Sequence, residues 1–155
     1  MIIDKTYIDE LLRYGERVTL ECKKAERGVP KSIWETYSAF ANTNGGIILL
    51  GVEEDLSAAV WDERFVIKGV LNPDQIVKDF WNTINSEKVS TCILKDENVQ
   101  VVEYNEQAKL VVIDIPQVPY NLRPVYINGN VYKGTFKRNF EGDYHCEEGE
   151  VKAMI

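Results

Sequence analysis

The chain of 155 residues has little of what several common protein classes require. Its three cysteines (Cys22, Cys92 and Cys146) are odd in number and lack the spacing of a zinc site, so we expect reduced thiols and a cytoplasmic protein. The single histidine, His145, has no partner at metal-ligand spacing and is interpreted as a surface loop residue. No apolar run approaches the roughly 20 residues of a membrane span, and no signal-peptide pattern opens the chain. We therefore expect no membrane partner.

Excess positive charge is also lacking, because the formal net charge is −7 at pH 7. This argues against a general nucleic-acid binder, whose affinity comes largely from neutralising phosphates. The charge is unevenly distributed, however. Residues 17–31 hold five basic and two acidic residues, and residues 123–140 hold four basic residues and no acid. If the two segments meet in the fold, they form a local positive face; otherwise they are solvated loop charges.

A phosphate-binding P-loop is the third absence. Gly45 and Gly46 follow a predicted helix and lead into a predicted strand. A P-loop has the opposite order, because it follows a strand and opens a helix with Gly-Lys-Ser or Gly-Lys-Thr. ATP binding by that mechanism is therefore not expected.

The chain is organised around residues 38–55. Apolar residues at three- and four-residue steps predict an amphipathic helix that ends near Asn42. Gly45 or Gly46 can then adopt the left-handed conformation that helix ends commonly require. Residues 47–52 are almost continuously apolar, which predicts a strand covered on both faces. The acids Glu53, Glu54 and Asp55 follow directly, either as a solvated turn or as part of a site.

The remaining pattern predicts an α/β (α+β) fold with a mixed, largely antiparallel sheet packed by helices. Turn signals favour a short hairpin across Asn128-Gly129-Asn130, and residues 56–70 are ambiguous, with short strands expected around Val60, Trp61, Phe65 and Ile67. Residues 1–155 are interpreted as one domain. Because the last helical pattern stops abruptly, we expect a fragment whose C-terminal domains are missing. The other predicted elements are helices over 4–14, 72–84 and 147–155, strands over 18–23, 91–94, 99–104 and 109–115 (the last three as an antiparallel meander), and hairpin arms over 125–127 and 131–133.

Three motifs carry a family resemblance. They are Glu16-x-x-x-x-Glu21-x-Lys23, Ala-Phe-Ala-Asn-Thr-x-Gly-Gly at residues 39–46, and Gly51-Val52-Glu53-Glu54. With segments 124–126, 131–134 and 142–144, they resemble the Schlafen-type AlbA-2 (Alba-like) domain, formerly called a divergent AAA domain, from about Tyr7 onward. The resemblance implies a nucleic-acid-binding module, which in bacteria sits at the N-terminus of proteins described as transcriptional regulators or helicase-like proteins.

The resemblance also implies an alternative, a divalent-metal-dependent nuclease. In the Schlafen proteins of animals the related core is an RNA endonuclease with three carboxylates, which fall on Glu16, Glu21 and Glu54 here. Such carboxylates can hold Mg²⁺ or Mn²⁺ and activate a water. Glu16 must lie in the turn after Gly15 for this site to form, because the five-residue spacing otherwise places it opposite Glu21. The structural alternative is a salt bridge from Glu21 to Lys23 or Arg17.

For nucleic-acid binding, DNA and RNA remain equally open as partners. The motif residues Asn42, Thr43, Gly45 and Gly46 are expected to shape the helix end rather than read bases. Three tyrosines, Tyr126, Tyr132 and Tyr144, are candidates for base stacking or for half-buried sheet positions. A further alternative is an assembly domain, forming homo-oligomers, that neither binds nor cuts. The residues expected to contact phosphates are Lys23, Lys24, Arg123, Lys133, Lys137 and Arg138.

Overall fold

The fold is centred on a four-stranded sheet in the order β1-β2-β6-β5. The computed structural model describes residues 3–55, 57–60, 63–140 and 142–155, without the side chain of Arg17. Strand β1 runs parallel to β2, whereas β6 is antiparallel to both β2 and β5. This confirms the predicted mixed, largely antiparallel sheet. The strands are β1 Leu20–Lys23, β2 Gly46–Leu50, β5 Val99–Glu103 and β6 Lys109–Ile115.

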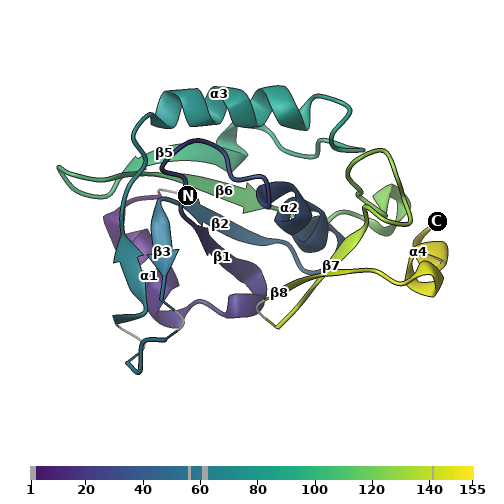
Figure 1. Ribbon diagram of the computed structural model, residues 1–155, viewed down its shortest axis with the longest axis horizontal. Helices are drawn as coiled ribbons and strands as arrows, with labels where there is room; N and C mark the ends of the chain where they lie inside the picture. Colours follow the sequence, from purple (N-terminus) through teal and green to yellow (C-terminus); the bar gives the residue numbers. More distant parts are fainter. Residues whose placement is uncertain (1–2, 56, 61–62, 141) are drawn as a thin grey trace.

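Helices cover both faces of this sheet (Figure 1). Ile48 and Leu50 of β2 face a core that includes Phe40 of α2 and Phe80 of α3. The intervening residue of β2, Leu49, packs in the opposite core with Ile8 of α1. Strand β2 is therefore buried on both faces, as its apolar sequence predicts. The helices are α1 Lys5–Tyr14, α2 Ile33–Asn42, α3 Pro73–Ile84 and α4 Glu148–Met154.

Two antiparallel hairpins flank the sheet. The first consists of β3 (Val52–Glu54) and β4 (Phe65–Ile67), and it contains the short strand expected around Phe65 and Ile67. The second consists of β7 (Phe136–Asn139) and β8 (Gly142–His145), which lies beside α2 and leads to α4 (Figure 1). Trp61, also considered for a strand, lies outside the described residues. The described residues also include the short 3-10 helices η1 Arg17–Thr19, η3 Asp96–Asn98 and η4 Tyr120–Leu122.

Two glycines determine where β2 begins and ends. Gly45 has a φ of 73°, so it provides the left-handed helix end that the sequence predicts, and a Cβ there would lie 2.7 Å from the carbonyl oxygen of Ile115. Gly51 has a φ of 102°. It turns the chain between Leu50 and Val52. The single strand predicted over residues 47–52 is therefore divided, with residues 47–50 in β2 and Val52 at the start of β3.

Strand predictions are also wrong at Val60, which lies in a bend, at residues 91–94 and at residues 131–133. Residues 91–94 form no strand, because Tyr37 of α2 captures their backbone: its hydroxyl donates to the carbonyl of Thr91 and accepts from the N–H of Ile93. Residues 131–133 form a turn rather than a hairpin arm, because the side chain of Asn130 accepts from two backbone N–H groups there. No helix of the described chain is both long and apolar enough to cross a membrane.

Asn42 at the end of α2 joins three segments of the chain. Its amide nitrogen donates to the carbonyls of Val125 and Phe136 at 2.9 and 3.0 Å, and its oxygen accepts from the N–H of Val125 at 2.8 Å. Ser38, one turn earlier on α2, bonds the same two residues. All these groups are buried, so each hydrogen bond replaces contact with water. The role of Asn42 is structural, in agreement with the sequence-based interpretation of a helix-end residue.

The Asn42→Ala variant should therefore lose at least about 2 kcal/mol of unfolding free energy, because it leaves buried backbone groups without partners. Urea denaturation measures this. Asn44→Ala, which changes the same residue type at an exposed position two residues later, should cost no more than about 0.5 kcal/mol. Equal effects of the two substitutions would show that the Asn42 network contributes little.

Candidate functional site

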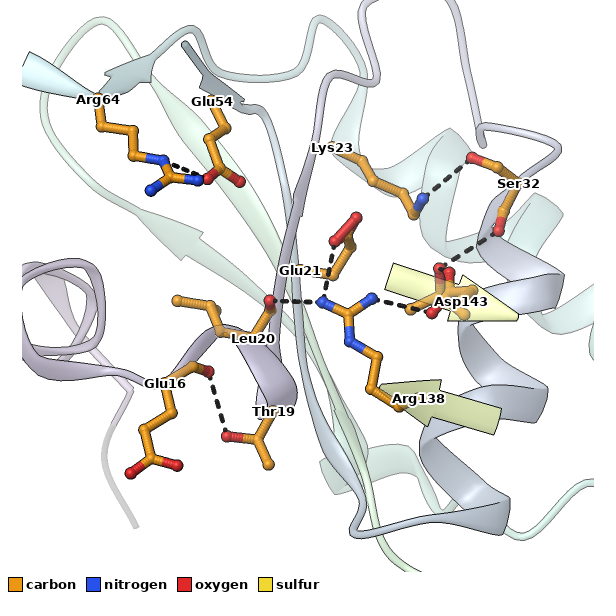
Figure 2. Close-up of polar contacts among 11 residues, drawn as sticks. Glu16, Thr19, Leu20, Glu21, Lys23, Ser32, Glu54, Arg64, Arg138 and Asp143 are labelled. Carbon is orange, nitrogen blue, oxygen red and sulfur yellow. Dashed lines mark hydrogen bonds and ion pairs between the residues drawn. The ribbon is translucent and has the colours of Figure 1, made fainter. Parts of the chain in front are cut away.

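Glu21, one of the three candidate carboxylates, is bonded to a buried arginine. Strand β1 directs Glu21 toward the side of the sheet covered by α2 and the β7–β8 hairpin. Arg138 of β7 reaches this side, and one terminal nitrogen lies 3.3 Å from the Glu21 carboxylate and 3.1 Å from the carbonyl oxygen of Leu20. The arginine side chain is only 1% exposed. Glu21 thus pairs with Arg138, a partner that the sequence did not suggest, whereas Lys23 bonds Ser32 (Figure 2). The side chain of Arg17, the other predicted partner, lies outside the described part of the chain.

A second carboxylate completes the pairing of Arg138. Asp143 of β8, directly across the hairpin, accepts from the other terminal nitrogen of Arg138 at 2.9 Å. Its second oxygen accepts the hydroxyl proton of Thr36 on α2. The guanidinium also lies 4.9 Å from the ring centre of Phe40. One buried cation therefore bridges β1, the hairpin and α2, and its desolvation is offset by two carboxylates.

Glu54 is paired with a different arginine. Arg64 lies just before β4, and its Nε is 2.6 Å from the Glu54 carboxylate. The two side chains are only 10% and 19% exposed. The pair therefore closes one end of the β3–β4 hairpin, where Glu54 faces Phe65 across the strands.

Glu16, the third candidate carboxylate, does lie in the turn after Gly15, as the nuclease hypothesis requires. It precedes η1, and its backbone carbonyl accepts from the backbone N–H and hydroxyl of Thr19. The residue is exposed, and its carboxylate points away from both Glu21 and Glu54 (Figure 2).

The lysines at the end of β1 remain accessible to solvent. Lys24 and Lys68 approach the carboxylate of Glu53 from two sides, each at 3.7 Å, and their side chains are 51% and 43% exposed. The neighbouring Lys23 donates to the hydroxyl of Ser32 at the start of α2. Arg27 and Lys31, in the loop that links β1 to α2, are also exposed. We call Lys23, Lys24, Arg27, Lys31 and Lys68 the β1-end cluster.

The candidate cations of the second basic segment are dispersed. Lys137 donates to both oxygens of Glu150 on α4, and this hydrogen bond raises the pKa of Lys137. Lys133 is exposed in the turn after Asn130. Arg123 lies 4.4 Å from the ring centre of Tyr120 and donates to the carbonyl of Val118. The two basic segments do meet, but through the buried Arg138, so that residue does not present its charge to a ligand as the sequence analysis expected.

A separate cavity of about 530 Å³ lies between α1 and β4, and none of the candidate residues lines it. Asp9 on its wall accepts from Lys5 at 2.8 Å and from the hydroxyl of Tyr104. Partial burial would raise the pKa of Asp9, but these two hydrogen bonds outweigh it and hold the pKa below its usual value.

The sequence profile of the family described as Schlafen, AlbA_2 matches residues 16–147. The chain belongs to this family. Among solved structures, it is similar to the N-terminal domain of a Nitrosomonas europaea protein named as related to RecG, an ATP-dependent DNA helicase, with a TM-score of 0.66, 25% identity and 94% of each chain covered. Among curated proteins, no sequence matches.

In this AlbA_2 domain, the carboxylates do not fit the divalent metal that the family resemblance implies. Glu21 and Glu54 are held by different arginines on different hairpins, and Glu16 is directed elsewhere. Across the described residues, no group of three or more histidine, cysteine, aspartate or glutamate side chains is placed to hold a metal ion. The predicted Mg²⁺ or Mn²⁺ site at Glu16, Glu21 and Glu54 is therefore not assembled in this structure.

Sequence patterns did not indicate the residues that pair with the candidate carboxylates and with Arg138. Arg64 and Lys68 fall in the ambiguous segment 56–70, where no periodicity placed them. Asp143 lies within segment 142–144, which resembles the family, but the resemblance gives it no partner; its position five residues after Arg138 suits a tight hairpin in which the two face each other. Thr36 gave no signal, because helical periodicity does not indicate a hydrogen-bond partner on another element.

Arg138→Met should destabilise the domain by about 3–5 kcal/mol, because it leaves two partly buried carboxylates without their cation. Lys137→Met is the matched control on the adjacent residue: it removes a partly exposed ion pair with Glu150 and should cost at most about 1 kcal/mol. Denaturant unfolding of both variants measures the difference, and a loss at Arg138 no larger than at Lys137 would contradict the bridging role.

Proposed function

We propose that this AlbA_2 domain binds nucleic acid through the β1-end cluster. The observation that carries the proposal is the pair Lys24 and Lys68, which share one carboxylate, Glu53, and so leave a net positive charge in a protein whose total charge is −7. At 3.7 Å the two ion pairs are long and solvent-accessible, and such pairs contribute only about 0–1 kcal/mol. A phosphate can therefore take the place of Glu53 at little cost.

The geometry also suits a backbone that runs across the cluster. Lys23 is the last residue of β1, and Lys24 follows it directly. The N–H of Gly51 donates to the carbonyl of Lys23, so the turn between β2 and β3 lies next to these two lysines. Lys68 follows β4, and its own N–H bonds the carbonyl of Gly51. Lysines whose backbones lie this close together, but whose side chains point in different directions, can each contact a different phosphate of one strand.

The family and the structural neighbour support the same proposal. The neighbour is the N-terminal domain of a protein named as helicase-related, and a place at the N-terminus of a larger protein is what the family resemblance implies for this chain. We therefore infer a cytoplasmic module that attaches a transcriptional regulator to DNA or RNA. The dispersed carboxylates favour binding without cleavage over the nuclease alternative.

The double variant Lys24→Ala/Lys68→Ala should weaken nucleic-acid binding and reduce the salt dependence of log K by about two phosphate contacts. Fluorescence anisotropy with labelled single-stranded and duplex DNA and RNA, at several salt concentrations, measures both. Lys78→Ala/Lys95→Ala makes the same change of charge at two other exposed lysines, on α3 and in the loop before η3. If both double variants bind with the same slope, the β1-end cluster is not the interface.

Binding without cleavage gives a second expectation. Labelled tRNA or single-stranded DNA incubated with the protein and Mn²⁺ should stay intact. Glu16→Gln is the control, because it removes one candidate ligand at an exposed position and leaves the Arg138 and Arg64 pairs in place. Cleavage by the unaltered protein that this substitution abolishes would restore the nuclease alternative.

A further inference from the structure

The β7–β8 hairpin has two faces of opposite character. Phe136 and Arg138 of β7 point inward and are buried. The alternate residue, Lys137, lies on the outer face, where it is paired across the strands with Tyr144 of β8. Tyr144 is 51% exposed, and its ring lies over the backbone of Gly142, 3.0 Å from where a Cβ on that residue would be. The outer face therefore carries an aromatic ring that is open to solvent, Tyr144, across from the ion pair of Lys137 with Glu150.

The tip of the hairpin carries a second exposed ring. Phe140 follows Asn139, which pairs with Gly142 across the hairpin, and it is 78% exposed. Its φ is 55°, in the left-handed region that favours glycine and asparagine. A phenylalanine at this position gains little burial and adopts an unfavourable backbone conformation. Folding alone therefore gives no reason for an aromatic residue here.

From these two rings we infer that the hairpin stacks on unpaired bases, so that the nucleic acid bound by this domain is single-stranded, or has a single-stranded part. This inference rests on the proposed function and names its ligand. Every base has an aromatic face, so stacking on Phe140 and Tyr144 requires no particular sequence. In a duplex, by contrast, the faces of the bases are already stacked on one another.

The small exposed area of Phe140 and Tyr144, and the rigid attachment of their hairpin, favour a base over another protein as the partner. Two partly exposed aromatic side chains offer far less than the roughly 800 Å² that each partner buries in a stable protein interface. They match the area of one or two bases. The hairpin is also fixed to the sheet through Arg138, which Asp143 accompanies. The second oxygen of Asp143 accepts from Thr36 on α2. One turn before Thr36, at the start of the same helix, Ser32 accepts from Lys23 (Figure 2). The rings are thus held on the same rigid unit as the start of the β1-end cluster.

Substitutions of Phe140 test this inference. Fluorescein-labelled oligo-dT and oligo-U of about 12 nucleotides, and a duplex of equal length, are suitable probes in anisotropy titrations. We expect Phe140→Ala and Phe140→Leu to weaken binding of both single strands by about tenfold and to leave duplex binding unchanged. Leucine keeps an apolar side chain without an aromatic face, so it separates stacking from hydrophobic contact. Phe140→Trp should retain the affinity.

Phe140→Asn separates binding from folding. Asparagine tolerates the left-handed conformation, so the Tm should stay equal to that of the unaltered protein or rise, while single-strand affinity falls as for alanine. A purely structural Phe140 would give a lower Tm instead. Unchanged single-strand affinity of Phe140→Ala, or an equal loss on duplex, overturns the inference.

The lysine variants distinguish this failure from failure of the proposed function. Lys24→Ala/Lys68→Ala should change the salt slope for every probe, whereas the Phe140 variants should leave that slope unaltered. If the lysine variant behaves as expected but Phe140→Ala does not, only the stacking inference is wrong. If the unaltered protein binds none of the probes, both the proposed function and this inference are overturned.

Discussion

The arrangement of this domain depends on one buried charge. Arg138 is almost completely removed from water, and an isolated guanidinium in such a place would cost several kcal/mol. It is tolerated because Glu21 and Asp143 neutralise it and the carbonyl of Leu20 accepts another of its protons. These partners come from β1 and β8, so satisfying one side chain fixes the hairpin against the edge of the sheet.

The need to neutralise buried arginines divides the charged residues into two groups, those that stabilise the fold and those that remain accessible. Glu21 and Glu54 are each committed to an arginine, which leaves them unsuited to sharing a metal ion. Accessible cations remain in the β1-end cluster, above all Lys24 and Lys68, whose shared partner Glu53 is partly exposed and lies 3.7 Å from each. An acidic protein can thus present a positive surface locally: its buried acids serve the fold, and its exposed lysines at the end of β1 are available to a polyanion.

Local patterns in the sequence predicted the fold well where they determine the structure directly. The apolar run after Gly46 gave the central strand, and the glycine signal gave the left-handed turn at Gly45. Predictions failed where a distant side chain intervened, as when Tyr37 captured the backbone of residues 91–94. The candidate site followed the same division. The residues were recognisable, but the pairing of Glu21 with Arg138, separated by 117 positions in the chain, depends on tertiary packing that spacing does not encode.

A double-mutant cycle between Arg138 and Asp143 tests the central claim most directly. Asp143→Asn keeps an acceptor for the Thr36 hydroxyl but removes the charge, and Arg138→Met removes the cation. Urea unfolding of the two single variants and the double variant gives their coupling free energy. The account predicts a coupling of more than about 1 kcal/mol, with Asp143→Asn much less costly once Arg138 is gone. Simple additivity of the two losses would contradict it, because the buried arginine would then not depend on its carboxylates.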